Sequence, residues 1–220
     1  MEIHQGSTVC VIGFVEPRAR IALTTGRCDG GEVATDSHQN VVGSVMLARR
    51  NIASETAPDG SIPGINYEVI KLAPGVTPTQ MLPAGRQLQS TPGLRALPAL
   101  PVCHFGLSAG QTCGRVDSIS NGRFVISDMP ADKFGGPVYT LTDDHHAVIV
   151  GLLDGGSGAF PEAESWQDVM KQLYLDIRPP TSQQSPSEVR TIGWISSEGG
   201  DRCANESSSL VPVATSARRC

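Results

Sequence analysis

The sequence is poor in aromatic and charged residues, and it has no long apolar run. Aromatic residues make up 5% and charged residues 18% of the 220 residues. The apolar run at residues 147–153 is far too short to cross a bilayer, which takes about 20 apolar residues. The formal charge is −5, so there is no basic surplus of the kind that favours nucleic acid. We therefore expect no membrane span and no nucleic-acid partner.

Turn-forming residues are abundant, with 24 glycines and 16 prolines. Many turns and few long amphipathic segments favour a mostly β protein. Prolines at residues 73–101 forbid a long helix or a central strand, so this segment is interpreted as a surface connection. An i, i+3, i+4 spacing of apolar residues predicts an amphipathic helix over residues 161–177. Its apolar face would consist of Trp166, Val169, Met170, Leu173, Tyr174 and Ile177. The expected strands are 8–16, 20–28, 40–49, 66–72, 100–106, 112–120, 123–128, 136–141 and 146–154.

The chain has six cysteines but no CxxC pair and no zinc-type spacing of cysteine and histidine. We therefore predict three disulfides formed in an oxidising compartment, rather than buried free thiols in a cytosolic protein. Six cysteines alone permit fifteen connectivities. The acidic and histidine residues at 143–146 are interpreted as a polar hairpin tip and not as a metal site, because adjacent histidines on a strand point to opposite faces. No metal and no cofactor are expected.

Three motifs occur in a characteristic order. They are CVIGF…IALTTGRC at residues 10–28, VCHFGLSAGQTCG at 102–114 and KFGGPVY at 133–139. Together they resemble the histidine segment, the disulfide loop and the GDSGGPVY motif of chymotrypsin-like (trypsin-like) serine proteases. The similarity is to the bacterial branch of streptogrisins and alpha-lytic protease, and it extends over roughly residues 8–177. Residues 150–158 resemble the strand and glycine-rich turn that wall the specificity pocket in this family.

The resemblance implies two six-stranded antiparallel β-barrels with an active-site cleft between them, followed by a C-terminal helix. For this chain we expect an N-terminal barrel and the inter-barrel connection in residues 1–95. Residues 96–178 would form the C-terminal barrel and the helix. Residues 179–220 would form a linker and a short, cysteine-containing C-terminal appendage. Whether that appendage folds back over the cleft is left open.

The triad positions of the family carry unsuitable residues. Arg27 stands in place of the histidine, and a guanidinium has no acceptor lone pair with which to act as a base. Phe134 stands in place of the serine and has no nucleophilic atom. Asn66 stands in place of the aspartate, in the loosest of the three alignments, and an amide cannot offset an imidazolium charge. The sequence therefore predicts that no catalytic residue of the triad is intact.

The oxyanion loop, residues 132–134 in this comparison, also departs from the family. Asp132 replaces the glycine whose N–H helps to bind the oxyanion, and Lys133 replaces an acid that makes a buried ion pair. A working protease that loses one triad member retains about 10³–10⁴-fold acceleration from the oxyanion hole and substrate binding. Here that source is altered as well. The alternative is a hydrolase or peptidase with a residual or relocated active site.

The resemblance also implies disulfide pairing and a role. It proposes bridges between Cys10 and Cys28 and between Cys103 and Cys113, and it leaves Cys203 and Cys220 as the third pair. We expect a bacterial protein that is secreted or held in the cell envelope, and that is a monomer. Without catalysis, it would bind an unidentified peptide or protein in the inter-barrel cleft, as a pseudoprotease.

Overall fold

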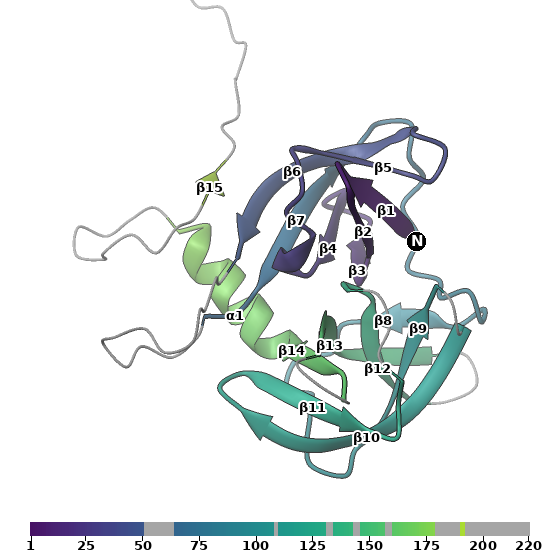
Figure 1. The fold of residues 1–220 in the computed structure, drawn as a ribbon, viewed down its shortest axis with the longest axis vertical. Coiled ribbons are helices and arrows are strands. Elements are labelled where there is room, and N and C mark those ends of the chain that lie inside the picture. The colour runs from purple at the N-terminus through teal and green to yellow at the C-terminus, as the bar shows by residue number, and fades with distance from the viewer. Residues whose placement is uncertain are drawn as a thin grey trace, which may run out of the picture.

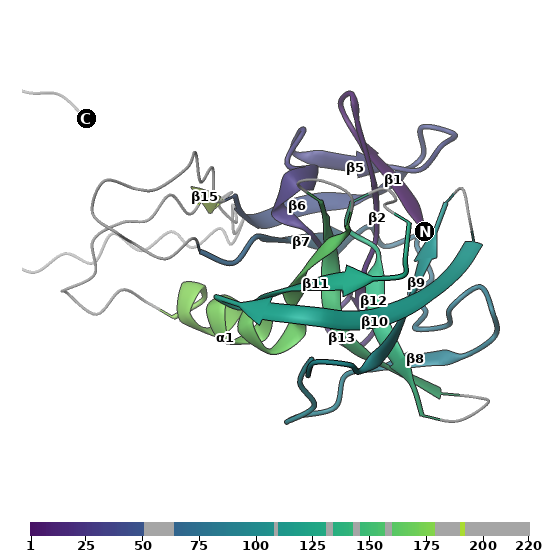
Figure 2. The same ribbon diagram turned by 60° about the horizontal axis from the view of Figure 1, so that its bottom comes forward.

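The computed structural model describes residues 1–50, 64–107, 110–130, 134–142, 146–156, 160–178 and 190–191. Within these ranges the chain forms two curved β-sheets and a single α-helix, α1 (Figures 1 and 2). The mostly β fold with a C-terminal helix is the fold that the sequence predicted. In the described part of the chain, no helix is long and apolar enough to cross a membrane.

The N-terminal sheet is curled, and its two edges come from one stretch of chain. Its strand order is β2-β1-β5-β6-β7-β4-β3, and β15 adds to β6. The edge strands β2 and β3 are separated only by residues 12 and 13, so the chain itself holds the two edges close together. No β2–β3 pairing closes the described part of this sheet into a barrel. Its strands are β1 (Glu2–Gln5), β2 (Thr8–Val11), β3 (Phe14–Glu16), β4 (Ile21–Thr24), β5 (Val33–Thr35), β6 (Val41–Arg49), β7 (Tyr67–Leu72) and β15 (Arg190–Thr191).

The C-terminal sheet is a closed six-stranded barrel, in the order β12-β9-β10-β11-β14-β13, because β12 also pairs with β13. A seventh strand, β8, runs parallel to β13. It lies inside the proline-rich segment that the sequence predicted to be a plain connection, and its edge position fits that composition. These strands are β8 (Gln87–Gln89), β9 (Pro101–Gly106), β10 (Gly110–Ser120), β11 (Arg123–Ser127), β12 (Pro137–Leu141), β13 (His146–Gly155) and β14 (Glu162–Ser165).

The helix α1 spans Trp166–Asp176 and is shorter than predicted. Residues 162–165 form β14 instead, because pairing with β11 and β13 buries them and overrides the helical pattern. Trp166 and Val169 are buried against the core, and Trp166 packs on Phe14 with ring centroids 5.0 Å apart. The predicted apolar face is too wide, since Met170 and Tyr174 are exposed.

One apolar core extends across both sheets. It contains Phe14 and Tyr67 from the N-terminal sheet together with Tyr139 and Leu152 from the barrel. The end of α1 is tied to the N-terminal sheet, because Asp176 accepts hydrogen bonds from Arg49 at 2.8 and 3.0 Å and from the Tyr67 hydroxyl at 2.6 Å. Burial, together with the hydrogen bond to Asp176, raises the pKa of Tyr67 well above its ordinary value. The helix therefore links the two halves (Figure 1).

Two of the three predicted disulfides are present. The Cys10–Cys28 bridge joins β2 to η1, the 3₁₀ turn at Gly26–Cys28. The Cys103–Cys113 bridge joins directly opposite residues of β9 and β10. Both pairings are confirmed. Cys203 and Cys220 lie outside the described residues, so the third pairing stays a prediction.

Candidate functional site

The three residues that the resemblance places at the triad positions lie together between the two sheets. Arg27 lies in the 3₁₀ turn η1, which Thr25 caps, and Asn66 directly precedes β7. Phe134 precedes β12, and the Arg27 guanidinium carbon is 5.8 Å from the centroid of its ring. The structure therefore brings these three predicted residues into one site. Asp132 and Lys133, also predicted to belong here, lie outside the described residues.

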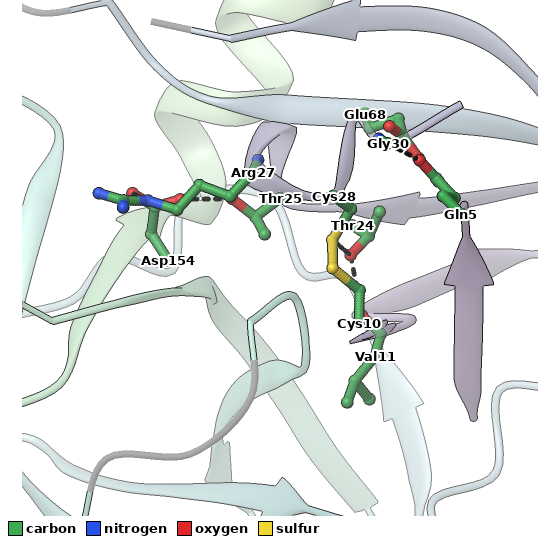
Figure 3. The surroundings of a disulfide bond; sticks show 10 residues. All are labelled: Gln5, Cys10, Val11, Thr24, Thr25, Arg27, Cys28, Gly30, Glu68 and Asp154. Carbon is green, nitrogen blue, oxygen red and sulfur yellow. Dashed lines mark hydrogen bonds and ion pairs between the residues drawn. A yellow bond between two sulfur atoms is a disulfide. The ribbon is translucent and has the colours of Figure 1, made fainter. Parts of the chain in front are cut away.

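Asp154, on β13, is the centre of the site, and it was not predicted to have a role. Its carboxylate accepts hydrogen bonds from the Thr25 hydroxyl, from Arg27 Nε at 3.1 Å and from Asn66 Nδ2 at 3.3 Å. The Asp154 side chain is 2% exposed, whereas that of Arg27 is 47% exposed. A buried carboxylate needs such donors, because burial without them is strongly unfavourable. Figure 3 shows Arg27 and Thr25 meeting Asp154.

A second buried carboxylate, Glu164 on β14, lies near Asp154. Burial raises the pKa of Glu164 to about 7, and the negative charge of Asp154 adds to this increase. Arg123 forms an ion pair with Glu164 at 2.9 Å, and its positive charge acts in the opposite direction on the pKa of Glu164. Each of these two buried carboxylates is thus paired with one arginine. The signal available in the sequence for Asp154 is an acid directly after the apolar run at residues 147–153.

Phe134 is held in place by backbone bonds to both sheets. Its carbonyl accepts a hydrogen bond from the Val11 N–H at 2.9 Å, and the next residue, Gly135, donates to the Leu153 carbonyl at 2.7 Å. The Phe134 ring lies against Gly155, where an added Cβ would come within 2.3 Å of the ring. The ring therefore covers the end of the strand that resembles the wall of the specificity pocket.

The Asp154 carboxylate accepts three donors, which are the Thr25 hydroxyl, the Arg27 guanidinium and the Asn66 amide. The Arg27 guanidinium, which stands at the histidine position in the resemblance, has no acceptor lone pair. No group of three His, Cys, Asp or Glu side chains in the described ranges could hold a metal ion.

A third buried carboxylate supports the disulfide-linked turn from within the N-terminal sheet. Glu68 on β7 accepts a hydrogen bond from the Gln5 amide, whose oxygen in turn accepts the Gly30 N–H at 3.2 Å. Gly30 lies two residues after Cys28, the last residue of the turn that carries Arg27, and Figure 3 shows this chain of contacts. Burial raises the pKa of Glu68 to about 8.

Glu68 and Glu164 predict that the protein is more stable in mild acid. Both pKa values are raised by folding from 4.5, so between pH 5 and pH 8 the native state holds protons that the unfolded chain has released. The free energy of unfolding therefore falls as pH rises through this window. We expect Tm to be about 5–10 °C higher at pH 5.5 than at pH 8.5, as measured by differential scanning calorimetry.

Glu68→Gln is the matched variant for this measurement, because an amide does not titrate. It should reduce the dependence of Tm on pH and raise Tm at pH 8.5 relative to the unsubstituted protein. A Tm that increases toward pH 8.5, or a variant with an unchanged pH profile, would contradict the assignment.

Comparison with known proteins yields two close relatives and several similar folds. Two proteins of Mycobacterium tuberculosis are each 41% identical to this chain over 180 residues, which are 80% of the chain and 81% of each relative. They are named Uncharacterized protein Rv1815, in strain ATCC 25618/H37Rv, and Uncharacterized protein MT1863, in strain CDC 1551/Oshkosh. No protein-family model matches the chain.

The similar solved structures are serine proteases. A glutamic acid specific serine protease has a TM-score of 0.59 and 16% identity, with 79% of this chain and 95% of the other covered. Thermobifida fusca Protease A has a TM-score of 0.56 and 19% identity, covering 79% and 93%. Cellulomonas bogoriensis chymotrypsin has a TM-score of 0.53 and 19% identity, covering 75% and 88%. The chain therefore has the chymotrypsin-like fold.

Proposed function

The chain belongs to the same family as the Mycobacterium tuberculosis protein Rv1815, and we propose that it is a catalytically inactive serine-protease homologue that binds peptides or proteins. The observation that carries this proposal is the ion pair of Arg27 with Asp154, at 3.1 Å. Arg27 stands at the histidine position in the resemblance, and Asp154 holds its guanidinium there. A permanently protonated guanidinium there cannot accept a proton from a nucleophile.

Phe134 supports the same conclusion. Its ring stands at the serine position and lies against Gly155, so it takes up space beside the former specificity pocket. Arg27 lies over this ring and holds Asp154 at the same time. The substitutions fit one another through these contacts, as expected of a site that is stable without catalysis.

The remaining function that we propose is binding. The Arg27 side chain is half exposed, and its two terminal nitrogens make no hydrogen bond to the described residues, because the ion pair uses Nε. These nitrogens could bind a carboxylate of an extended peptide in the two-pronged manner of arginine. We propose acidic peptide segments as the ligand. The two disulfides support an exported protein in an oxidising compartment.

The first test is hydrolysis. Purified protein should show no turnover of a fluorogenic panel of peptide and ester substrates, and a fluorophosphonate should not label it. Phe134→Ser should be equally inactive, because no base faces the new hydroxyl. Activity that copurifies with the protein and is blocked by the fluorophosphonate would contradict the proposal, and so would an active Phe134→Ser variant.

The second test is binding. A peptide array should retain acidic peptides, and Arg27→Gln should weaken their binding about tenfold, as expected for loss of a charge-assisted hydrogen-bonded pair. Arg18→Gln is the control, since Arg18 is exposed on the loop between β3 and β4. Two outcomes would remove this site from the proposal. One is that Arg27→Gln retains acidic peptides as strongly as the unsubstituted protein does, and the other is that the unsubstituted protein retains basic peptides as strongly as acidic ones.

A further inference from the structure

A cavity of about 260 Å³ lies between the two sheets, apart from the site of Arg27 and Asp154. β2 and β3 form one wall, the residues after β7 form a second wall, and the end of β9 forms a third. The apolar side chains that line the cavity include Val11, Phe14, Leu72, Leu82, Leu88 and Phe105.

The backbone around the cavity offers little to a polar ligand. Seven of the lining N–H groups donate to carbonyls of the protein, at distances between 2.8 and 3.0 Å. An extended peptide binds by pairing with free backbone groups, and a buried water needs two to four polar partners. The cavity wall therefore favours hydrocarbon over peptide or water. The lining N–H groups with such partners belong to Val11, Ile12, Gly13, Leu72, Val76, Leu82 and Leu88.

The polar side chains of the lining belong to Thr77, Thr79 and Gln80, and Gln80 already donates to the Val15 carbonyl. Thr77 and Thr79 are exposed, and no lining side chain is charged. The lining residue Met1 carries the N-terminal amino group, whose pKa is lowered by burial, so its neutral form is favoured. Met81 and Leu107 lie at the same rim and are 52% and 38% exposed. A ligand would thus meet apolar surface along its length and hydroxyl groups at its outer end.

The segment after β7, which forms the second wall of the cavity, is held in place by hydrogen bonds within the protein. Arg20, in a left-handed backbone conformation with φ of 51°, donates from Nη2 to the carbonyls of Ala73 at 2.7 Å, Pro74 at 3.2 Å and Val76 at 2.9 Å. Gln80 donates to the Val15 carbonyl at 3.2 Å and so joins the same segment to β3. A cavity with walls held in this way is preorganised, which favours binding because little ordering remains to be done.

We propose that this inter-barrel cavity binds the hydrocarbon part of an uncharged amphiphile, with the polar end at Thr77 and Thr79. A cavity of about 150 Å³ lined by apolar residues accepts benzene, so one of 260 Å³ holds about ten carbon atoms. A single medium-length alkyl chain has this volume. The absence of charged side chains from the lining makes an alcohol, ester or amide the fitting head group.

Isothermal titration calorimetry with linear alcohols tests the site. Decan-1-ol should bind, and Kd should fall about fourfold for each methylene between hexan-1-ol and decan-1-ol, since each buried methylene contributes about 0.8 kcal/mol. The gain should stop near ten carbons, where the cavity is full. Decanoate should bind at least tenfold more weakly than decan-1-ol at pH 8. Equal affinity for the two would contradict the uncharged head group.

Two variants place the ligand. Val76→Phe fills the cavity from its wall and Leu107→Trp covers its rim, and each should weaken decan-1-ol binding at least tenfold. Ile119→Trp is the control for Leu107→Trp, since Ile119 is a comparably exposed apolar residue, 41% exposed, and does not line the cavity. It should bind like the unsubstituted protein. Circular dichroism verifies that each variant is folded.

The proposal is overturned if decan-1-ol does not bind to the unsubstituted protein. It is also overturned if affinity is independent of chain length, or if folded Leu107→Trp binds as tightly as Ile119→Trp. If Val76→Phe does not fold, Leu107→Trp alone decides the location. None of these outcomes depends on whether the protein hydrolyses or binds peptides.

Discussion

Replacing Arg27 with methionine should lower the free energy of unfolding by about 2–4 kcal/mol, although Arg27 is half exposed. The effect arises at its partner. Asp154 is buried, and without Arg27 its negative charge would have no positive partner. Only the hydrogen bonds from the neutral groups of Thr25 and Asn66 would remain. Removing one partner of a buried pair is more harmful than removing both. The measurement is urea denaturation at pH 7.5.

The double variant Arg27→Met/Asp154→Asn should recover part of this loss, because the amide removes the unbalanced charge and keeps an acceptor for Thr25. Arg18→Met is the control and should change stability by less than about 0.5 kcal/mol, as exposed substitutions usually do. If Arg27→Met were as stable as Arg18→Met, the ion pair of Arg27 with Asp154 would contribute nothing measurable to the free energy of unfolding. A double variant less stable than both single variants would also contradict the coupling.

Replacing Gly135 with alanine should be still more harmful, with a loss of about 4 kcal/mol or failure to fold. Its φ is +95°, and an added Cβ would lie 2.1 Å from Thr24 Oγ1 and 2.4 Å from the Val11 carbonyl oxygen. The carbonyl belongs to the backbone of β2, so it cannot turn aside. Thermal denaturation and the yield of soluble protein measure the effect.

The control variant Gly93→Ala measures the backbone strain of a positive φ without the steric clash that is expected at Gly135. Gly93 has a similar φ of +85°, but an added Cβ would meet nothing within 4 Å. Its substitution should reduce stability by only about 1 kcal/mol, which is the penalty of the backbone conformation alone. If both alanine variants lost the same stability, the close packing of Gly135 would have no energetic importance.

The sequence predicted those features that follow from local pattern. Alternating apolar residues and turns gave most strands, and the order of the cysteine and glycine motifs led to the fold and to two disulfides. The predicted start of the helix was wrong, because Glu164 and its neighbours fit the pattern of a helix and the pattern of a strand equally well. Only the ladders of β14 with β11 and β13, which are distant in sequence, decide between them.

The candidate site was predicted in part. Arg27, Asn66 and Phe134 could be located by the motifs around them, whereas Asp154 could not. Asp154 is separated from Arg27 by 127 positions. Its role depends on how the two sheets pack, because β13 pairs only with strands of the C-terminal sheet, and no local spacing encodes that packing. A lone acid in an apolar strand indicates that a partner exists without identifying the partner.

The segment at Phe134 and Gly135 affects how the molecule can move. The carbonyl of one residue is bonded to β2, and the N–H of the next is bonded to β13. The single peptide group between Phe134 and Gly135 thus joins the two sheets through its C=O and its N–H, and a hinge motion that separated the sheets here would break at least one of these bonds. The barrels should therefore unfold cooperatively, with hydrogen exchange at the Val11 and Gly135 amides as slow as global unfolding. The segment that resembles the GDSGGPVY motif thus connects the two sheets directly.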